Sequence, residues 1–147
     1  MKLVVISDTH GRHDDVTVPG GGILIHCGDC IEGANAACAY AAGFLSWLHR
    51  QPHENKLLIA GNHDWIFDVG ADQARAIVAA HAPGVHYLHD SGCEIDGVRF
   101  WGSPVSPRFF DWAFNRDRGA DIRRHWDMIP TGADVLITHG PPHGILD

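Results

Sequence analysis

Four apolar segments that each run straight into polar, metal-ligating side chains constrain this chain more than any other feature. The polar residues at their ends include Asp8, Asp29, Asn62 and His139. Continuous apolar runs of this length are typical of strands buried on both faces. The runs are LVVIS at 3–7, GGILIHCGD at 21–29, KLLIAG at 56–61 and DVLITHG at 134–140. Because ligands of layered α/β proteins lie past the carboxyl ends of their strands, we expect these residues to share one site.

The rest of the pattern predicts an α/β layered fold. Apolar residues at helical spacing predict helices over 34–50, 70–81 and roughly 119–128. Short β-rich runs predict strands at 85–89, 93–97 and 98–102, and Asp96-Gly97 favours a hairpin between the last two. Residues 103–117 are interpreted as an ordered loop. Strand–helix units followed by hairpins indicate either one mixed sheet or two sheets within a single domain, 1–147.

Composition narrows the range of partners. The chain of 147 residues carries a formal charge of −7, which disfavours non-specific nucleic-acid binding. The N-terminal apolar run is too short for a secretion signal, and no segment approaches a membrane span. We therefore expect a cytoplasmic protein with reduced thiols, no membrane association and a small substrate. Cys27 and Cys30 have the spacing of a redox pair. Asp29, which lies between them, is a candidate metal ligand, so a redox role is the less favoured interpretation.

Each candidate site residue also has an ordinary structural explanation. Asp8 and Asp29 could cap helices or turns, and a single His10 or His139 could be a surface residue. Recurrence of such residues after every central strand is what favours a shared metal site. Asp, His and Asn together suit Mn²⁺, Fe or Zn²⁺ better than Ca²⁺.

The order of these motifs resembles a known family. The sequence D-x-H, G-D, G-N-H-D and T-H-G is similar to that of the calcineurin-like metallophosphoesterases. The strings ISDTHG, LIHCGD, IAGNHD, WGSP and LITHGPP resemble the MPPED branch of metallophosphodiesterases, over the whole chain from Met1 to Asp147. The resemblance implies a layered β-sandwich flanked by helices and hydrolysis of small or cyclic nucleotide-type phosphodiesters.

The resemblance also implies roles for individual residues. Asp8 and His10 would bind one divalent metal ion, Asp29 would bridge two, and Asn62 and His139 would bind the second, with manganese favoured. His63 would be catalytic rather than a ligand: it would face the scissile phosphate and protonate the leaving oxygen. Asp64, next in the chain, is expected only to cap or orient the loop locally.

The chain departs from the family pattern at one point. A later Gly-His-x-His motif, which the family uses for one further ligand to each metal, does not occur in these residues. We therefore expect a C-terminally truncated domain that lacks the last strands and keeps three protein ligands per metal. His143 is either an extra ligand or substrate contact, or an exposed loop histidine.

An incomplete sheet has a consequence for assembly. Residues 134–138 would lie on an open edge, and open edges pair with other chains, so we expect a homodimer, with or without domain swapping. The alternative to an active enzyme is a weakly active or inactive remnant that binds metal or nucleotide and acts as a dimeric interaction protein.

The remaining histidines and tryptophans receive simpler predictions. His26 is expected in the core. Surface positions are expected for His13, His49, His53 and His125, and packing roles for Trp47, Trp112 and Trp126. The segment FFDWAFNR at 109–116 either packs on the sheet or shapes a substrate pocket.

Overall fold

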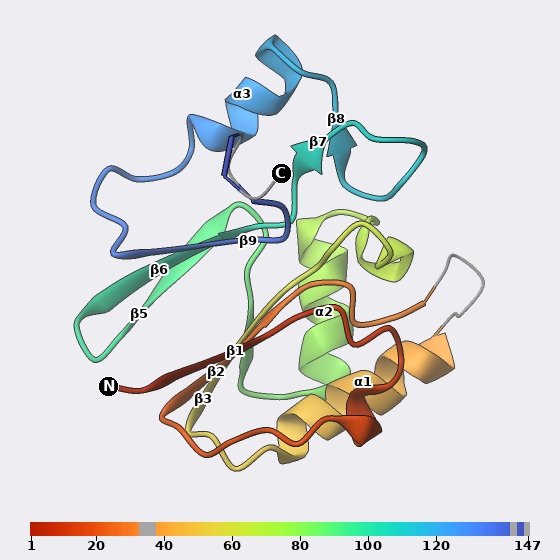
Figure 1. Ribbon diagram of the computed structural model, residues 1–147, viewed down its shortest axis with the longest axis vertical. Helices are drawn as coiled ribbons and strands as arrows, with labels where there is room; N and C mark the ends of the chain where they lie inside the picture. Colours follow the sequence, from red (N-terminus) through yellow and green to blue (C-terminus); the bar gives the residue numbers. More distant parts are fainter. Residues whose placement is uncertain (33–37, 142–143, 146–147) are drawn as a thin grey trace.

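Two β-sheets packed face to face form the centre of the computed structural model, which describes residues 1–32, 38–141 and 144–145 (Figure 1). The first sheet is parallel, with the order β1-β2-β3-β4. The second has the order β5-β6-β9, in which β5 and β6 are antiparallel and β6 and β9 are parallel. The strands of the two sheets are β1 (Leu3–Ile6), β2 (Ile23–Cys27), β3 (Asn55–Ile59), β4 (Val85–Tyr87), β5 (Ser91–Ile95), β6 (Val98–Ser103) and β9 (Val135–Thr138).

Helices cover the outer face of the first sheet. Helices α1 (Cys38–Arg50) and α2 (Ala71–His81) lie on this face, and α3 (Ala120–Trp126) lies at the other end of the molecule (Figure 1). Short 3₁₀ turns occupy His13–Asp15 and Trp65–Phe67. No helix in the described part of the chain is long and apolar enough to cross a membrane.

Alternate residues of the central strands enter two different cores. Leu24 and Leu58 pack toward the helices with Phe44, whereas Ile25 and Leu57 pack between the sheets. The second sheet contributes Phe100, Ile137 and their neighbours to this inter-sheet core. Burial on both faces explains why β2 and β3 have continuous apolar sequences rather than alternating ones.

Most of the predicted elements are confirmed, and the structure decides between one mixed sheet and two sheets in favour of two. The predicted hairpin is present, with φ of 52° at Asp96 and 78° at Gly97. The predicted helix over 34–50 is observed from Cys38, and 34–37 lie outside the described residues. The prediction of a loop over 103–117 is wrong in part, because β7 (Ser106–Pro107) and β8 (Asn115–Arg116) pair there as a short parallel ribbon.

Two sheet edges carry exposed apolar side chains. Within the residues that the structure describes, β1 pairs only with β2, and β9 pairs only with β6. Leu3 and Val5 are 37% and 59% exposed, although their register partners Ile23 and Ile25 lie in the inter-sheet core. Leu136 of β9 is 50% exposed. The inner face of β1 therefore extends beyond the cover that the second sheet provides.

Several histidines are placed differently from the sequence prediction. His26 is buried, as expected, and His49 is exposed. His13 and His53 are buried, so their predicted surface positions are wrong. His13 packs against the aromatic rings of α1, and His53 reaches the carbonyl of Pro19. His125 is largely covered, because it bonds to Asp90.

Candidate metal centre

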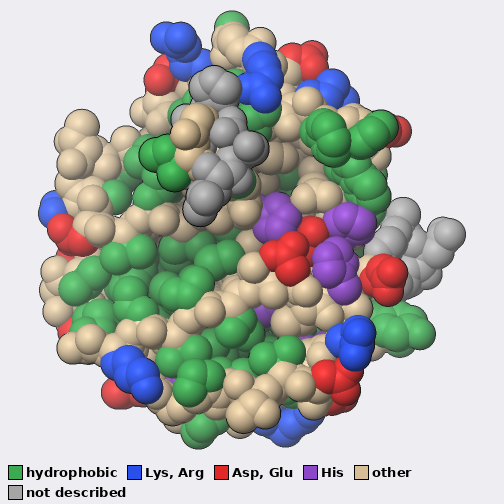
Figure 2. Space-filling view, in the orientation of Figure 1, with side chains coloured by type: hydrophobic (Ala, Val, Ile, Leu, Met, Phe, Trp, Pro, Cys, Tyr) green, Lys and Arg blue, Asp and Glu red, His purple; other side chains and the backbone are tan. Residues whose placement is uncertain are grey.

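The ends of β1, β2 and β3 bring the predicted site residues together. The backbone N–H of Asp8 donates to the carbonyl of Gly28 at 3.0 Å, and that of His10 donates to the carbonyl of Asp29 at 3.0 Å. These bonds tie the loop after β1 to the loop after β2. Figure 2 shows histidine and acidic side chains gathered together on the surface of the molecule, apart from the broad hydrophobic area.

Three of the predicted ligands form one compact group. The ligand atoms of Asp8, His10 and Asp29 all lie within 4.8 Å of one another. His10 Nε2 is 3.9 Å from Asp8 Oδ1 and 3.7 Å from Asp29 Oδ2. Two carboxylates and an imidazole at this spacing suit a divalent transition-metal ion.

A second group shares Asp29. His139 Nε2 lies 2.9 Å from Asn62 Oδ1 and 3.4 Å from Asp29 Oδ2. The other ring nitrogen of His139, Nδ1, is 2.8 Å from the carbonyl oxygen of Cys27, so it carries the proton and donates it. In many metal sites such a bond fixes the histidine ring and directs its other nitrogen, here Nε2, toward the metal ion.

The atoms in this second group are acceptors that need a positive charge between them. The Asn62 and Asp29 oxygens cannot donate, so His139 Nε2 must either be protonated or share a cation with them. Burial lowers the pKa of His139, but the hydrogen bond and charge of Asp29 outweigh burial and raise this pKa to about 9. For Asp29, burial raises the pKa, whereas its bonds to His139 and to the His63 backbone lower it, and the result is a lowered pKa. The residues present therefore fit a divalent cation at Asp8, His10 and Asp29, and the donor atoms of Asn62 and His139 adjoin the same Asp29 carboxylate.

Two glycines keep space for this arrangement. A Cβ atom on Gly61 would lie 2.3 Å from Asp29 Oδ1 and 2.9 Å from the His139 ring. A Cβ on Gly28 would lie 2.6 Å from the backbone nitrogen of Gly61, and Gly28 has a φ of 98°. Only glycine at both positions lets β2 and β3 end this close together.

Three of the candidate ligands have unusual backbone geometry. Asp8, His10 and Asp29 have φ angles of 56°, 43° and 54°, in the left-handed region. Non-glycine residues adopt this region rarely, and it is concentrated at functional sites.

The predicted catalytic residue lies beside these ligands. His63 Nε2 is 3.9 Å from Asp29 Oδ2, and the His63 ring meets the His10 ring edge-on with centroids 4.8 Å apart. The backbone N–H of His63 donates to Asp29 Oδ1 at 2.8 Å. The ring is thus held next to the carboxylate of Asp29 and the ring of His10.

Asp64 has a larger structural role than its sequence position indicates. It is fully buried and accepts hydrogen bonds from the backbone N–H groups of Gly61, Cys30 and Ile31. The Cys30 thiol also donates to it. Asp64 therefore locks the loop after β2 to the loop after β3, which sets Asp29 relative to Asn62.

The hydrogen bond from the Cys30 thiol to Asp64 also argues against a redox pair of Cys27 and Cys30. Burial and Asp64 raise the pKa of the Cys30 thiol, and burial raises that of Cys27 to about 11. Reactive redox cysteines have lowered pKa values instead.

Trp112, for which the sequence favoured a packing role and left a pocket role for its segment open, lies beside the site. The Trp112 ring lies against the His63 ring with centroids 4.1 Å apart. The four aromatics of segment 109–116 were a signal, but their sequence does not reveal which ring reaches His63. His143 lies outside the described residues.

Comparison with known proteins assigns the family. The family model described as calcineurin-like phosphoesterase matches residues 1–146, so the chain belongs to the calcineurin-like phosphoesterase family. The two-sheet architecture, with helices outside, is accordingly the calcineurin-like fold.

Two curated relatives are similar along the whole chain. Metallophosphoesterase domain-containing protein 1 of Homo sapiens is 38% identical over 165 residues, which cover 99% of this chain and 50% of that protein. UPF0046 protein K07C11.7 of Caenorhabditis elegans is 39% identical over 157 residues, covering 100% of this chain and 53% of that protein. The chain thus spans about half the length of these relatives. The first agrees with the resemblance to the MPPED branch.

A solved crystal structure supports the fold independently. It superposes with a TM-score of 0.64 at 15% sequence identity and covers 97% of this chain and 70% of that chain.

Proposed function

We propose that this protein hydrolyses phosphodiesters, of the small or cyclic nucleotide type, at a centre of two divalent metal ions, with manganese favoured. The observation that carries the proposal is the position of one oxygen. Asp29 Oδ2 lies 3.7 Å from His10 Nε2 on one side and 3.4 Å from His139 Nε2 on the other. A carboxylate between two ligand groups is suited to bridging two cations.

The residues divide the chemistry between them. Asp8 and His10 would hold one cation, Asn62 and His139 the other, and Asp29 both. Bound cations would supply positive charge for the phosphoryl oxygens and activate a water molecule. The neutral amide of Asn62 completes the second group without adding negative charge beside an anionic substrate. His63, next to both groups, would donate a proton to the leaving oxygen.

The test is hydrolysis of bis-p-nitrophenyl phosphate by purified protein with and without added Mn²⁺, together with metal content per chain. We expect two ions per chain and a manganese-dependent rate that Asp29→Asn abolishes. Metal binding without hydrolysis above the metal-only background would reject the enzyme and favour a metal- or nucleotide-binding interaction protein.

We also propose that two copies of the chain associate through the edge of β9. The support is the uncovered apolar surface: a strand added beside β9 would extend the second sheet toward Leu3 and Val5 of β1. Figure 2 shows hydrophobic side chains in a broad area over this part of the molecule. A second copy can supply that strand by edge pairing or by exchange of an element. Light scattering at micromolar concentration tests this, and a monomer would contradict it.

The proposal places the protein in the cytoplasm. Its support is that three of the four cysteines, Cys27, Cys30 and Cys93, are free thiols in the described part of the chain. Unpaired thiols are typical of reducing compartments. Microscopy of the tagged protein in intact cells would test this placement.

A further inference from the structure

Two adjacent aromatic side chains near the candidate metal centre have no packing role. Phe109 and Phe110 are 70% and 75% exposed, and their rings meet edge to face with centroids 4.5 Å apart. Burying a phenylalanine side chain is worth about 1.5–3 kcal/mol, which these two residues largely forgo. Their exposure therefore calls for a ligand or a partner.

The segment that carries them is fixed rather than loose. Asn115, which is mostly buried, donates from Nδ2 to the carbonyls of Phe109 and Phe110 at 3.3 and 3.0 Å. Phe110 has a φ of 51°, a costly conformation for a bulky residue that persists only where the surroundings enforce it. The rings are thus held outward by hydrogen bonds from behind.

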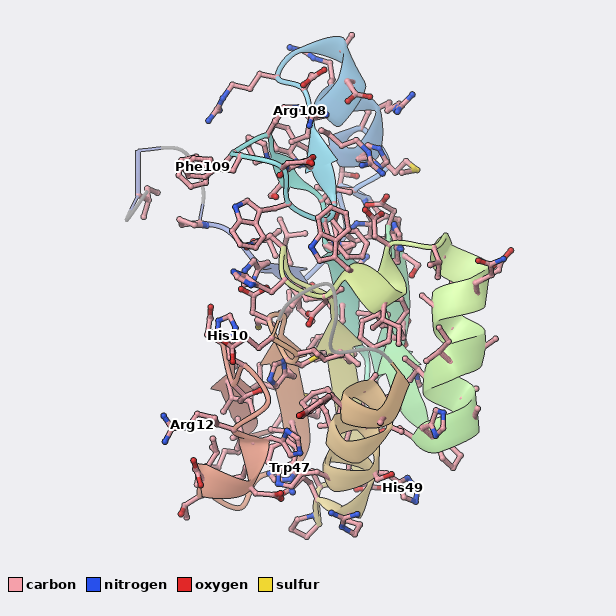
Figure 3. All side chains as sticks on the ribbon, turned by 90° about the vertical axis from the view of Figure 1, so that its right-hand side faces the viewer. His10, Arg12, Trp47, His49, Arg108 and Phe109 are labelled. Carbon is pink, nitrogen blue, oxygen red and sulfur yellow. The ribbon has the colours of Figure 1, made fainter. Side chains whose placement is uncertain are left out.

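The same segment, 109–116, also contacts residues of the candidate metal centre. Its Trp112 ring lies on the His63 ring, and the backbone N–H of Ala113 donates to the carbonyl of Asn62 at 3.1 Å. Figure 3 shows Phe109 and His10 on the same side of the molecule. A phosphate held beside His63 would therefore have an aromatic surface next to it.

We propose that Phe109 and Phe110, together with Trp112, bind the planar base of a nucleotide substrate whose phosphate occupies the metal centre. This inference rests on the proposed function. Because Trp112 lies against His63, the bound base belongs to the group that carries the leaving oxygen. In a nucleoside 2′,3′-cyclic phosphate, that group is the nucleoside.

Size and charge favour a base over a macromolecule. Two phenylalanine rings offer at most about 300–500 Å², since an aromatic side chain buries about 150–250 Å². A stable protein interface needs about 800 Å² from each partner. The neighbouring Asp111 and the net charge of −7 oppose an anionic lipid surface. Stacking of a base on aromatic side chains is worth about 1–3 kcal/mol.

The experiment compares two pairs of ligands that differ only in the base. Hydrolysis is measured with 2′,3′-cyclic AMP and with 1-O-methylribose 2′,3′-cyclic phosphate. Binding is measured by calorimetry, with Mn²⁺ present, using 3′-AMP and 1-O-methylribose 3-phosphate. We expect the base to improve both Kd and kcat/KM at least about fivefold, the lower end of the stacking range. In the double variant Phe109→Ala/Phe110→Ala both ratios should fall to the smaller value that Trp112 alone supports, with the baseless ligands unaffected.

Two further variants distinguish stacking on the rings from non-specific hydrophobic contact. Phe109→Leu/Phe110→Leu keeps apolar area but removes the flat rings, and it should behave like the alanine variant. Trp126→Ala removes an exposed aromatic from α3 and should leave both ratios unchanged. Circular dichroism verifies that each variant folds.

The outcomes separate this inference from the proposed function. Hydrolysis of both cyclic esters with no preference for the base, or a preference that is undiminished in the double variant, would overturn the inference and leave the phosphodiesterase intact. No hydrolysis of either ester, with a base preference in binding that the double variant loses, would reject the enzyme and support the aromatic site. No binding of any of these ligands would overturn both.

Discussion

Gly28 and Gly61 show how strongly single residues determine the candidate metal centre. Each stands at the end of a strand where an added Cβ would strike the backbone or a ligand. For Gly61, the nearest atom is Oδ1 of Asp29 itself. A change of one methyl group at this point acts on the ligands directly.

Replacing Gly61 with alanine should weaken manganese binding. The new Cβ would displace the Asp29 carboxylate, so we expect at least a tenfold rise in Kd, as for other changes that disturb the supports of metal ligands. Calorimetric titration with Mn²⁺ measures this. Gly20→Ala is the matched control, because a Cβ there meets nothing within 4 Å. Equal affinities for the two variants would contradict the role of Gly61.

Replacing His63 with alanine should separate binding from turnover. The variant should keep both ions, since His63 is not a proposed ligand, and should lose roughly 10²–10⁴-fold in kcat, the contribution of a general acid. Metal content and hydrolysis of bis-p-nitrophenyl phosphate are the two measurements. His86→Ala, at an exposed position of β4, is the control. An unchanged kcat would remove the proton-donor role.

Replacing His26 with glutamine should flatten the dependence of stability on pH. His26 Nδ1 accepts from the Gly28 N–H at 3.3 Å, so Nε2 donates to Thr9 Oγ1 at 3.1 Å. Burial lowers the pKa of His26 to about 3, whereas the unfolded chain titrates at its ordinary value of 6.5. The free energy of unfolding is therefore not reduced by His26 above pH 6.5, and it falls as the pH drops, by about 2 kcal/mol at pH 5.

The glutamine amide can donate to Thr9 Oγ1 in place of Nε2 and does not titrate. Urea unfolding at pH 7 and pH 5 should show a smaller loss for His26→Gln than for the unchanged chain, since the other histidines contribute equally to both. Identical losses would rule out this effect of His26.

At the scale of elements, the sequence predicted the long buried strands better than it predicted short strands and contacts between distant segments. Apolar runs located β1, β2, β3 and β9, because burial on both faces leaves a strong local signal. Pairing of β7 with β8 was missed, because each strand is two residues long and depends on contacts between distant segments. Burial of His13 and His53 was missed for a similar reason: the rings and carbonyl that receive them come from elsewhere in the chain.

In the candidate site, too, features encoded locally could be predicted, and contacts between distant segments could not. The ligand types follow the strands in the sequence, so their meeting at one edge could be predicted. The contact of Trp112 with His63 could not, because it joins residues from two separate loops. The left-handed geometry of Asp8 and Asp29 also has no local sequence signature beyond their tolerance of it.

The edge of β9 gives a prediction at this scale. Leu136→Lys should shift a dimer toward monomer, because charged side chains on an edge strand oppose pairing. Size-exclusion chromatography with light scattering over a concentration series reports the change. Val69→Lys is the control, with a similar exposure of 47% against 50% for Leu136. If both variants dimerise as the unchanged chain does, β9 is not the interface.

For the whole molecule, metal binding should couple to folding. The ligands come from both sheets, with Asp29 after β2 and His139 after β9, so a bound ion would link the two layers. Mn²⁺ at one hundred times its Kd should add about 2.7 kcal/mol to the free energy of unfolding. Thermal unfolding should then shift upward by roughly 5–10 °C for a chain of this size, and a chelator should reverse the shift. The Asp29→Asn variant should show little response to Mn²⁺, and a full response in that variant would contradict the bridging role.

The left-handed backbone at Asp8 and Asp29 determines how the site should be dissected. After glycine, aspartate and asparagine are the residues that adopt this conformation most readily. Alanine there would alter the loop as well as the ligand, and the two effects could not be told apart. Asparagine keeps the shape and removes only the charge, so it is the substitution of choice for trapping an intact substrate in crystals. The same restriction predicts which changes natural selection finds first when a chain of this kind loses its chemistry: Asp to Asn or Gly, with the surrounding loops left in place.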